Sequence, residues 1–303
     1  MAELYITNSN SSPIVPPLDT ALPLSAVSSP SQPHRTYSPA SPDLLSLAGA
    51  APLPVPTVSV GPTPLTIRKL LHSQSADQFS GVAVHRRAPA SPPSLLALDG
   101  WGPAKPLAGT GPTFVVAALG KDAELIYEEG LVDKLCGNST RVRVLVPEIA
   151  SPTGLVESLG FGHGRRILCP IPSVIDLTEP PVIPDFMKDL EAAGWFPVKV
   201  TAYETRWMGP KCVEKLINLD EKLDAVLFTS TAEVEGLLKG LDEFGWDWRT
   251  VNRRWPEIVV GAHGPVTAKG AESFGVAVDV VSERFSSFDV LLDALKLRWR
   301  GSC

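Results

Sequence analysis

The chain has 303 residues, of which 44% are hydrophobic and 20% are charged, and its formal net charge is −6 at pH 7. These proportions are typical of a globular protein, and the length allows two ordinary α/β domains. The acidic balance argues against a nucleic-acid partner, because phosphate binding uses clustered Lys and Arg side chains. The sequence has no apolar run of membrane-spanning length, so we expect no membrane partner.

Cysteine and histidine spacing predicts neither a disulfide framework nor a metal site. The four cysteines lie far apart and form no C-x-x-C pair, so we expect free thiols. The five histidines show no metal-ligand spacing. The glycines of "LGFGHGRR" (residues 159–166) precede a predicted strand, whereas those of a dinucleotide-binding fingerprint follow one, so we interpret them as a loop.

Residues 1–40 are rich in Ser and Pro and have too few apolar side chains to form a core, so we predict a disordered tail. Acidic residues are scarce there, as in an organelle transit peptide, but Arg35 is the only Lys or Arg before Arg68. A misassembled start of the reading frame is a third interpretation. Within this segment, "ELYIT" (residues 3–7) is the only candidate for a strand.

From about residue 113 onward, apolar runs alternate with amphipathic runs, a pattern typical of a parallel α/β sheet. The predicted elements are, in chain order, a strand at 113–120, a helix at 121–130, a strand at 141–146, a helix at 151–160, a strand at 165–170, a helix at 180–194 and a strand at 196–205. Ser151 is the predicted N-cap of the second helix. The third helix has one apolar face, formed by Ile183, Phe186, Met187 and Leu190.

A second set of elements repeats the first, which indicates two related domains. "FVVAALGKDAELIYEEGL" aligns with "IVVGAHGPVTAKGAESFGV", and "VLVPEIASPTGLVESL" aligns with "VVSERFSSFDVLLDAL". One turn differs between the copies. The second copy has Thr229-Ser230-Thr231 where the first has "HRRAPASPP" (residues 85–93), whose adjacent prolines would break the early turns of a helix.

Two turns of the second copy combine hydroxyl groups with the start of a helix. "DAVLFTSTAEVEGLL" (residues 224–238) is a strand, a hydroxyl turn and a helix, and "GAHGPVTAKGA" (residues 261–271) begins a second helix at Gly264. Both turns follow strands, at the edge where open α/β sheets bind ligands, and helix starts favour carboxylates. Helix capping alone is an equally good interpretation of either turn. Lys269 is a candidate charge, although a solvated helix face explains it as well.

These motifs resemble the uroporphyrinogen-III synthase family, most closely its plant members. "DAVLFTSTAEVEGLL", "VVGAHGPVTAKGAESFGVAVDVV" and "SSFDVLLDAL" resemble the C-terminal half of the family, and "VIPDFMKDLEAAGWFPVKVTAYETRW" resembles its central elements. The resemblance implies an α/β fold of two related three-layer domains with parallel sheets and a cleft between them. It also implies a discontinuous first domain at residues 41–60 and 199–303, and a second domain at 61–198.

The resemblance further implies a lyase of porphyrin biosynthesis, on the route to heme and chlorophyll. Its substrate would be the linear tetrapyrrole hydroxymethylbilane, closed to uroporphyrinogen III with inversion of the last ring. The family needs no cofactor, and we expect a monomer. The likeness to plant members implies a chloroplast location, with the cytoplasm as the alternative.

The resemblance also assigns site residues. Tyr203 matches the family's tyrosine and would donate a proton to the departing hydroxyl group; a lone strand tyrosine otherwise packs with its hydroxyl at the surface. His263 replaces the apolar residue usual before Gly-Pro in the family. The altered turn at residues 85–93 suggests an alternative, a degenerate family member that binds a tetrapyrrole or a protein partner without turnover. The expected substrate-binding residues are Thr229, Ser230, Thr231, Gly264 and Thr267.

Overall fold

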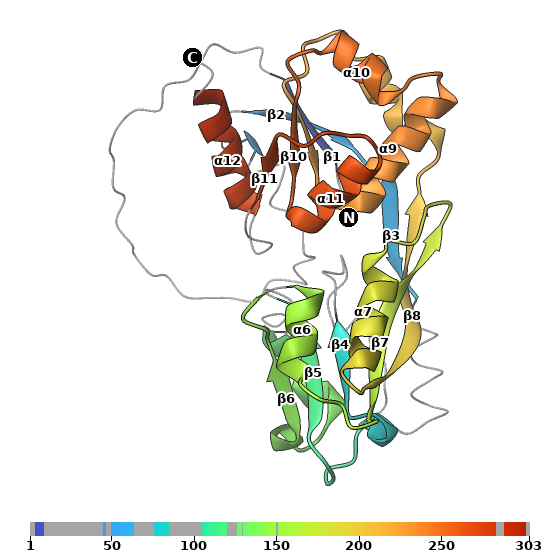
Figure 1. Ribbon diagram of the computed structural model, residues 1–303, viewed down its shortest axis with the longest axis vertical. Helices are drawn as coiled ribbons and strands as arrows, with labels where there is room; N and C mark the ends of the chain where they lie inside the picture. The colour runs from blue at the N-terminus through green and yellow to red at the C-terminus, as the bar shows by residue number, and fades with distance from the viewer. Residues whose placement is uncertain are drawn as a thin grey trace, which may run out of the picture.

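The computed structural model describes residues 4–8, 45–46, 50–63, 76–84, 105–119, 126–128, 130–149, 151–282 and 288–300. Its strands form two sheets, one in each half of the molecule (Figure 1). We call the part built on the five-stranded sheet, ordered β11-β10-β9-β1-β2, domain 1. Domain 2 contains the six-stranded sheet, ordered β3-β8-β7-β4-β5-β6.

Domain 1 places helices on both faces of its sheet. The strands are β1 (Leu4–Asn8), β2 (Ala51–Val55), β9 (Ala225–Phe228), β10 (Val259–Ala262) and β11 (Val280–Val281). The helices are η3 (Pro210–Val213), α8 (Glu214–Ile217), α9 (Thr231–Glu243), α10 (Trp248–Arg254), α11 (Pro265–Ser273) and α12 (Phe288–Arg300). Helices α8 to α11 contribute to one apolar cluster, and α12 to a second cluster that includes Leu227 and Val259. Two clusters on one sheet make three layers.

Domain 2 has the same three-layer plan. Its strands are β3 (Val58–Pro62), β4 (Gly81–Val84), β5 (Phe114–Ala118), β6 (Val142–Leu145), β7 (Arg166–Ile175) and β8 (Phe196–Trp207). Its helices are η1 (Ala76–Gln78), α5 (Leu131–Leu135), η2 (Ser139–Arg141), α6 (Pro152–Leu159) and α7 (Val182–Ala192). Helices α6 and α7 pack in one cluster and α5 in another. The predicted α/β fold of two related three-layer domains is confirmed.

Two local predictions in domain 2 are also confirmed. The Ser151 hydroxyl accepts a hydrogen bond from the Gly154 amide at 3.0 Å and so caps α6. The predicted apolar face of α7 is buried along its whole length. It packs beside Leu155 and Leu159 of α6, because residues spaced at three and four positions share one side of a helix.

The sequence repeat appears directly in the two sheets. Strands β4, β5 and β6 are neighbours in parallel, and β9, β10 and β11 are neighbours in parallel in the same order. Because the matched strands occupy matched places, their carboxyl ends define a corresponding edge in each domain.

The sheets depart from the expected parallel pattern at β1 and β3. Strand β1 lies within the segment predicted as a tail, covers most of "ELYIT" and runs antiparallel to both β2 and β9. Strand β3 runs antiparallel to β8. Predictions for residues 9–40, for the turn at 85–93 and for most of the helix at 121–130 lie outside the described residues.

Strands β3, β7 and β8 join the domains along one side of the molecule (Figure 1). Strand β7 is longer than predicted because "PIPSVI" continues it to Ile175. Strands β3 and β8 pair from Val58 with Trp207 to Pro62 with Tyr203 and so run across both predicted domain boundaries. The boundaries at residues 61 and 198 therefore stay predictions.

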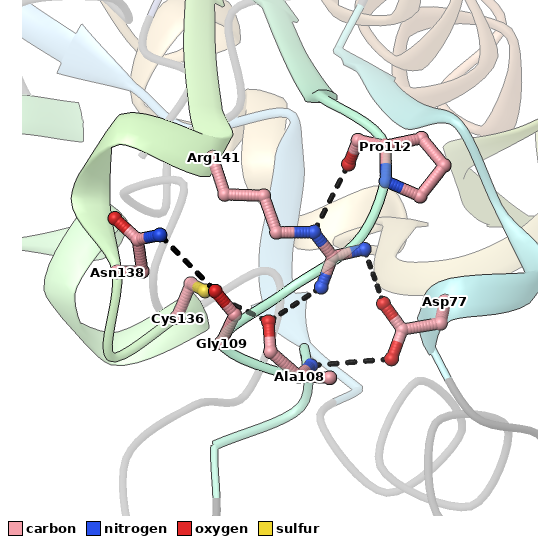
Figure 2. Close-up of polar contacts among 7 residues, drawn as sticks. All are labelled: Asp77, Ala108, Gly109, Pro112, Cys136, Asn138 and Arg141. Carbon is pink, nitrogen blue, oxygen red and sulfur yellow. Dashed lines mark hydrogen bonds and ion pairs between the residues drawn. The ribbon is translucent and has the colours of Figure 1, made fainter.

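A buried arginine fixes the amino ends of the strands in domain 2 (Figure 2). The Arg141 side chain forms an ion pair with Asp77, and its guanidinium group donates hydrogen bonds to the carbonyl oxygens of Ala108 and Pro112. Asp77 also accepts a hydrogen bond from the Ala108 amide at 3.1 Å. These residues precede β4, β5 and β6, at the edge opposite the carboxyl ends, so we assign the cluster to stability.

We expect Arg141→Ala to lower the free energy of unfolding by about 2–4 kcal/mol, because the Asp77 carboxylate loses its ion pair and two carbonyl groups lose their guanidinium donor. Chemical denaturation of the two-domain protein measures this loss. Arg143→Ala is the control, since Arg143 lies exposed on the adjoining β6. Equal stability of the two variants would contradict the assignment.

Candidate functional site

The turn between β9 and α9 caps its helix with its own side chains. Strand β9 ends at Phe228, and Ser230 is the N-cap of α9. The Ser230 hydroxyl accepts a hydrogen bond from the Glu233 amide at 3.4 Å, and the Glu233 carboxylate returns to the Ser230 amide at 3.0 Å. This reciprocal pair is a capping box, which satisfies donors that a helix start otherwise leaves open.

Glu233 accepts more hydrogen bonds in this turn than the capping box alone requires. Its side chain is fully buried and accepts hydrogen bonds from the Thr229 amide at 2.6 Å and the Thr229 hydroxyl at 2.8 Å. The Thr229 and Ser230 amides are therefore already bound by an internal carboxylate, as the capping interpretation of this turn predicts for Ser230. The S-x-x-E spacing in "STAE" was the sequence signal for this role.

The start of α9 still leaves two amides available. Within the part of the chain that the structure describes, the amides of Thr231 and Ala232 have no hydrogen-bond acceptor. They are the first two amides of the helix, where no intrahelical acceptor exists.

No described side chain caps the start of α11. Its N-cap is Gly264, whose φ of 90° and ψ of 160° favour a residue without a Cβ atom. Pro265 follows and has no amide hydrogen. The amides of Val266 and Thr267 find no acceptor among the described residues. Because no described side chain balances this helix start, α11 presents a less satisfied positive end than α9 among the residues that the structure describes.

The structure brings the five predicted substrate-binding residues into one cluster at the carboxyl ends of β9 and β10. The Thr267 side chain is 3% exposed, and its hydroxyl donates to the Thr229 carbonyl at 3.4 Å. A Cβ atom on Gly270 of α11 would lie 2.2 Å from the Thr231 hydroxyl oxygen. The first residue of α9 therefore touches the middle of α11. Lys269 lies exposed on α11, as the solvated interpretation predicts.

The histidine before the second turn is buried. His263 is 6% exposed, and its Nδ1 atom lies 3.4 Å from the hydroxyl oxygen of the fully buried Ser282. Its amide donates to the Phe228 carbonyl at 2.8 Å, which ties the end of β10 to the end of β9. A polar partner explains how a histidine occupies this buried position.

Tyr203 lies in the other domain, apart from the five-residue cluster. It is 3% exposed and packs in the apolar cluster that contains Val84 and Ala118, the last residues of β4 and β5. It therefore stands at the carboxyl edge of the domain 2 sheet. In Figure 1, α11 is on the side of domain 1 that faces domain 2.

Other kinds of site find no support in the described part of the chain. It contains no group of acidic, histidine or cysteine side chains that could hold a metal ion. Burial raises the pKa of the Cys169 thiol to about 12 and that of Cys212 to about 11, so neither is a thiolate nucleophile at neutral pH. Every described helix is too short or too polar to cross a bilayer.

Comparison with known proteins gives one family match. A family model described as uroporphyrinogen-III synthase HemD matches residues 115–291. Curated proteins gave no match.

Two of the solved structures that are similar to the chain come from Thermus thermophilus. A mutant uroporphyrinogen III synthase from this bacterium is 19% identical, with a TM-score of 0.49 over 87% of this chain and 95% of the other. A second structure, titled Thermus thermophilus uroporphyrinogen III synthase, is 18% identical, with a TM-score of 0.36 over 85% of this chain and 94% of the other. Similarities this distant say nothing about substrate or mechanism.

We expect Glu233→Ala to lower the free energy of unfolding by about 3 kcal/mol, because three donors lose a buried acceptor. Added formate should restore part of this loss, since it can occupy the vacated position between the Thr229 and Ser230 amides. Thermal unfolding with and without formate measures both effects. Glu243→Ala, at the exposed end of the same helix, is the control and should respond to neither. A Glu233→Ala protein as stable as Glu243→Ala would refute the role of Glu233.

Proposed function

Because a model of the uroporphyrinogen-III synthase family matches residues 115–291, the chain belongs to that family, and we propose that it converts hydroxymethylbilane to uroporphyrinogen III. The family match is the observation that carries this proposal. The reaction closes the linear tetrapyrrole and inverts its terminal ring. We propose that the chain performs it as a monomer without a cofactor.

The α11 start suits the carboxylates of such a substrate. Its amides at Val266 and Thr267, which have no acceptor among the described residues, suit an anion, and the helix dipole favours negative charge there. At α9 the Glu233 carboxylate already balances part of the corresponding charge, and among the described amides of this turn Thr231 and Ala232 remain as donors. We therefore assign the stronger carboxylate contact to α11 and a weaker one to α9.

In this reaction the protein contributes mainly by positioning the substrate. Loss of the hydroxyl group as water leaves an electrophilic azafulvene, which the substituted carbon of the terminal pyrrole attacks to form a spiro intermediate. Holding the carboxylates fixes the folded shape of the chain and disfavours simple head-to-tail closure. A weak acid near the departing hydroxyl assists. Tyr203 is the proposed acid, because it matches the family tyrosine and stands at the carboxyl edge of domain 2.

A binding protein without turnover is the second candidate. The internal carboxylate of Glu233 favours it, since it removes two amides from the donors available to the substrate. The two candidates differ in one measurable respect, the isomer of the product. Hydroxymethylbilane closes spontaneously to uroporphyrinogen I, so an active protein yields isomer III and a binding protein leaves isomer I.

We expect Tyr203→Phe to lower turnover about 100-fold with little change in substrate affinity, because only the acid contribution is lost. Hydroxymethylbilane is generated in situ, and isomers I and III are separated by chromatography after oxidation. Tyr127→Phe is the matched control, since Tyr127 is 65% exposed. Isomer I alone from the folded wild-type protein would refute the synthase and favour the binding protein.

We expect Gly264→Ala to weaken binding of uroporphyrinogen III about tenfold, because a Cβ atom strains the turn that presents the α11 amides. Gly275→Ala is the control, since Gly275 has a φ of 80° just after the other end of α11 and suffers a similar backbone strain away from these amides. Anaerobic calorimetry measures both affinities. Equal weakening of binding in the two variants would show that the carboxylates do not bind at the α11 start.

A further inference from the structure

Two exposed apolar side chains lie at the carboxyl edge of the domain 2 sheet, in the turn between β6 and α6 (residues 146–149). Val146 comes directly after β6 and is 50% exposed, and Ile149 is 66% exposed. In Figure 1, α6 lies at the end of domain 2 that is nearer to domain 1. Single exposed hydrophobic residues are common on protein surfaces, so exposure alone assigns these two no role.

The main chain of Ile149 is held firmly although its side chain lies in solvent. Its carbonyl oxygen accepts a hydrogen bond from the Ser151 amide at 2.7 Å. A Cβ atom on the buried Gly154 of α6 would lie 2.3 Å from this oxygen and 3.2 Å from the Ile149 Cβ atom, so the turn packs directly against the helix. A β-branched side chain on a fixed backbone has few rotamers, so Ile149 loses little conformational freedom when a ligand covers it.

The turn between β6 and α6 suits carboxylates poorly. At the start of α6, Pro152 has no amide hydrogen and the Gly154 amide is already capped, which leaves the Thr153 amide without an acceptor among the described residues. Glu148 is exposed immediately before Ile149 and adds a negative charge. This edge of domain 2 therefore offers hydrocarbon to a ligand and repels its anionic groups.

The start of α11 in domain 1 offers the complementary groups. Two of its amides, those of Val266 and Thr267, have no acceptor among the described residues and suit carboxylates. The Val266 side chain is 41% exposed beside them. A tetrapyrrole carries its carboxylates on short chains around apolar rings, so its two kinds of group match two different walls.

We propose that the two domains divide the ligand between them: the helix starts of domain 1 bind its carboxylates, and Ile149, supported by Val146, packs against the face of a pyrrole ring. This inference takes its ligand from the proposed function and adds an apolar contact residue to it. The contact holds the ring at the carboxyl edge of domain 2, where Tyr203 also lies. Burial of apolar surface on binding gives a negative heat-capacity change, which makes the ring contact measurable by itself.

Anaerobic calorimetry with uroporphyrinogen III at several temperatures tests the division. We expect Ile149→Ala to weaken binding about fivefold and to make the heat-capacity change of binding less negative, because hydrocarbon is removed from the contact. Ile149→Leu keeps the hydrocarbon and should bind within about twofold of the unmodified protein. Gly264→Ala should weaken binding without this change in heat capacity. Phe196→Ala is the control, since Phe196 is 59% exposed at the first residue of β8, at the opposite edge of the same sheet.

The isomer assay separates failure of this inference from failure of the proposed function. A protein that yields only isomer I but shows the expected differences in binding would refute the synthase and leave the division of the ligand standing. A protein that yields isomer III but binds uroporphyrinogen III equally well with and without the Ile149 side chain would overturn the division. An equal loss of affinity in Phe196→Ala, an unaltered heat-capacity change in Ile149→Ala, or no binding by the unmodified protein would overturn it as well.

Discussion

The buried carboxylate of Glu233 connects the parts of this molecule on which binding depends. Its two oxygens fix Thr229 and Ser230, and the main-chain carbonyl group of Glu233 accepts a hydrogen bond from the hydroxyl of Thr57, which lies between β2 and β3. The Thr229 carbonyl in turn accepts the hydroxyl of Thr267 from the second helix start. A charge taken out of water is tolerated only when its hydrogen bonds are complete, so this residue dictates the geometry of its neighbours.

The amino edge of the domain 2 sheet and the carboxyl edge of the domain 1 sheet differ in how their polar groups are paired. In domain 2 the amino ends of the strands are tied by Arg141, which directs its donors to a carboxylate and to backbone carbonyl groups. In domain 1 the carboxyl ends carry helix starts, some of whose amides find no acceptor in the described part of the chain. Polar groups that are fully paired stabilise a fold, whereas unpaired ones at a sheet edge are available to a ligand.

Sequence patterns predicted the repeated elements because short-range periodicity determines them. The apolar face of α7, the Ser151 cap and the matched strand order all follow from spacing within or between copies. A β-bulge at Ala202, an extra residue of β8 in its pairing with β7, escaped prediction, since "VTAYET" alternates like any regular strand and only the partner strand reveals the extra residue. The antiparallel direction of β1 and the contact of Glu235 with Thr178 escaped for the same reason, because both depend on segments remote in sequence.

Strand β1 has a consequence for the order in which the chain acquires its structure. It lies between β2 and β9 in the sheet, and β9 is translated only after the whole of domain 2. During synthesis domain 2 can form its core first, because all of its strands are available by Trp207. Strands β1 and β2 must meanwhile keep an unpaired edge until β9 emerges, and a nascent edge of this kind invites pairing with other chains. Delayed closure of domain 1 therefore lengthens the period in which the newborn polypeptide is prone to aggregation.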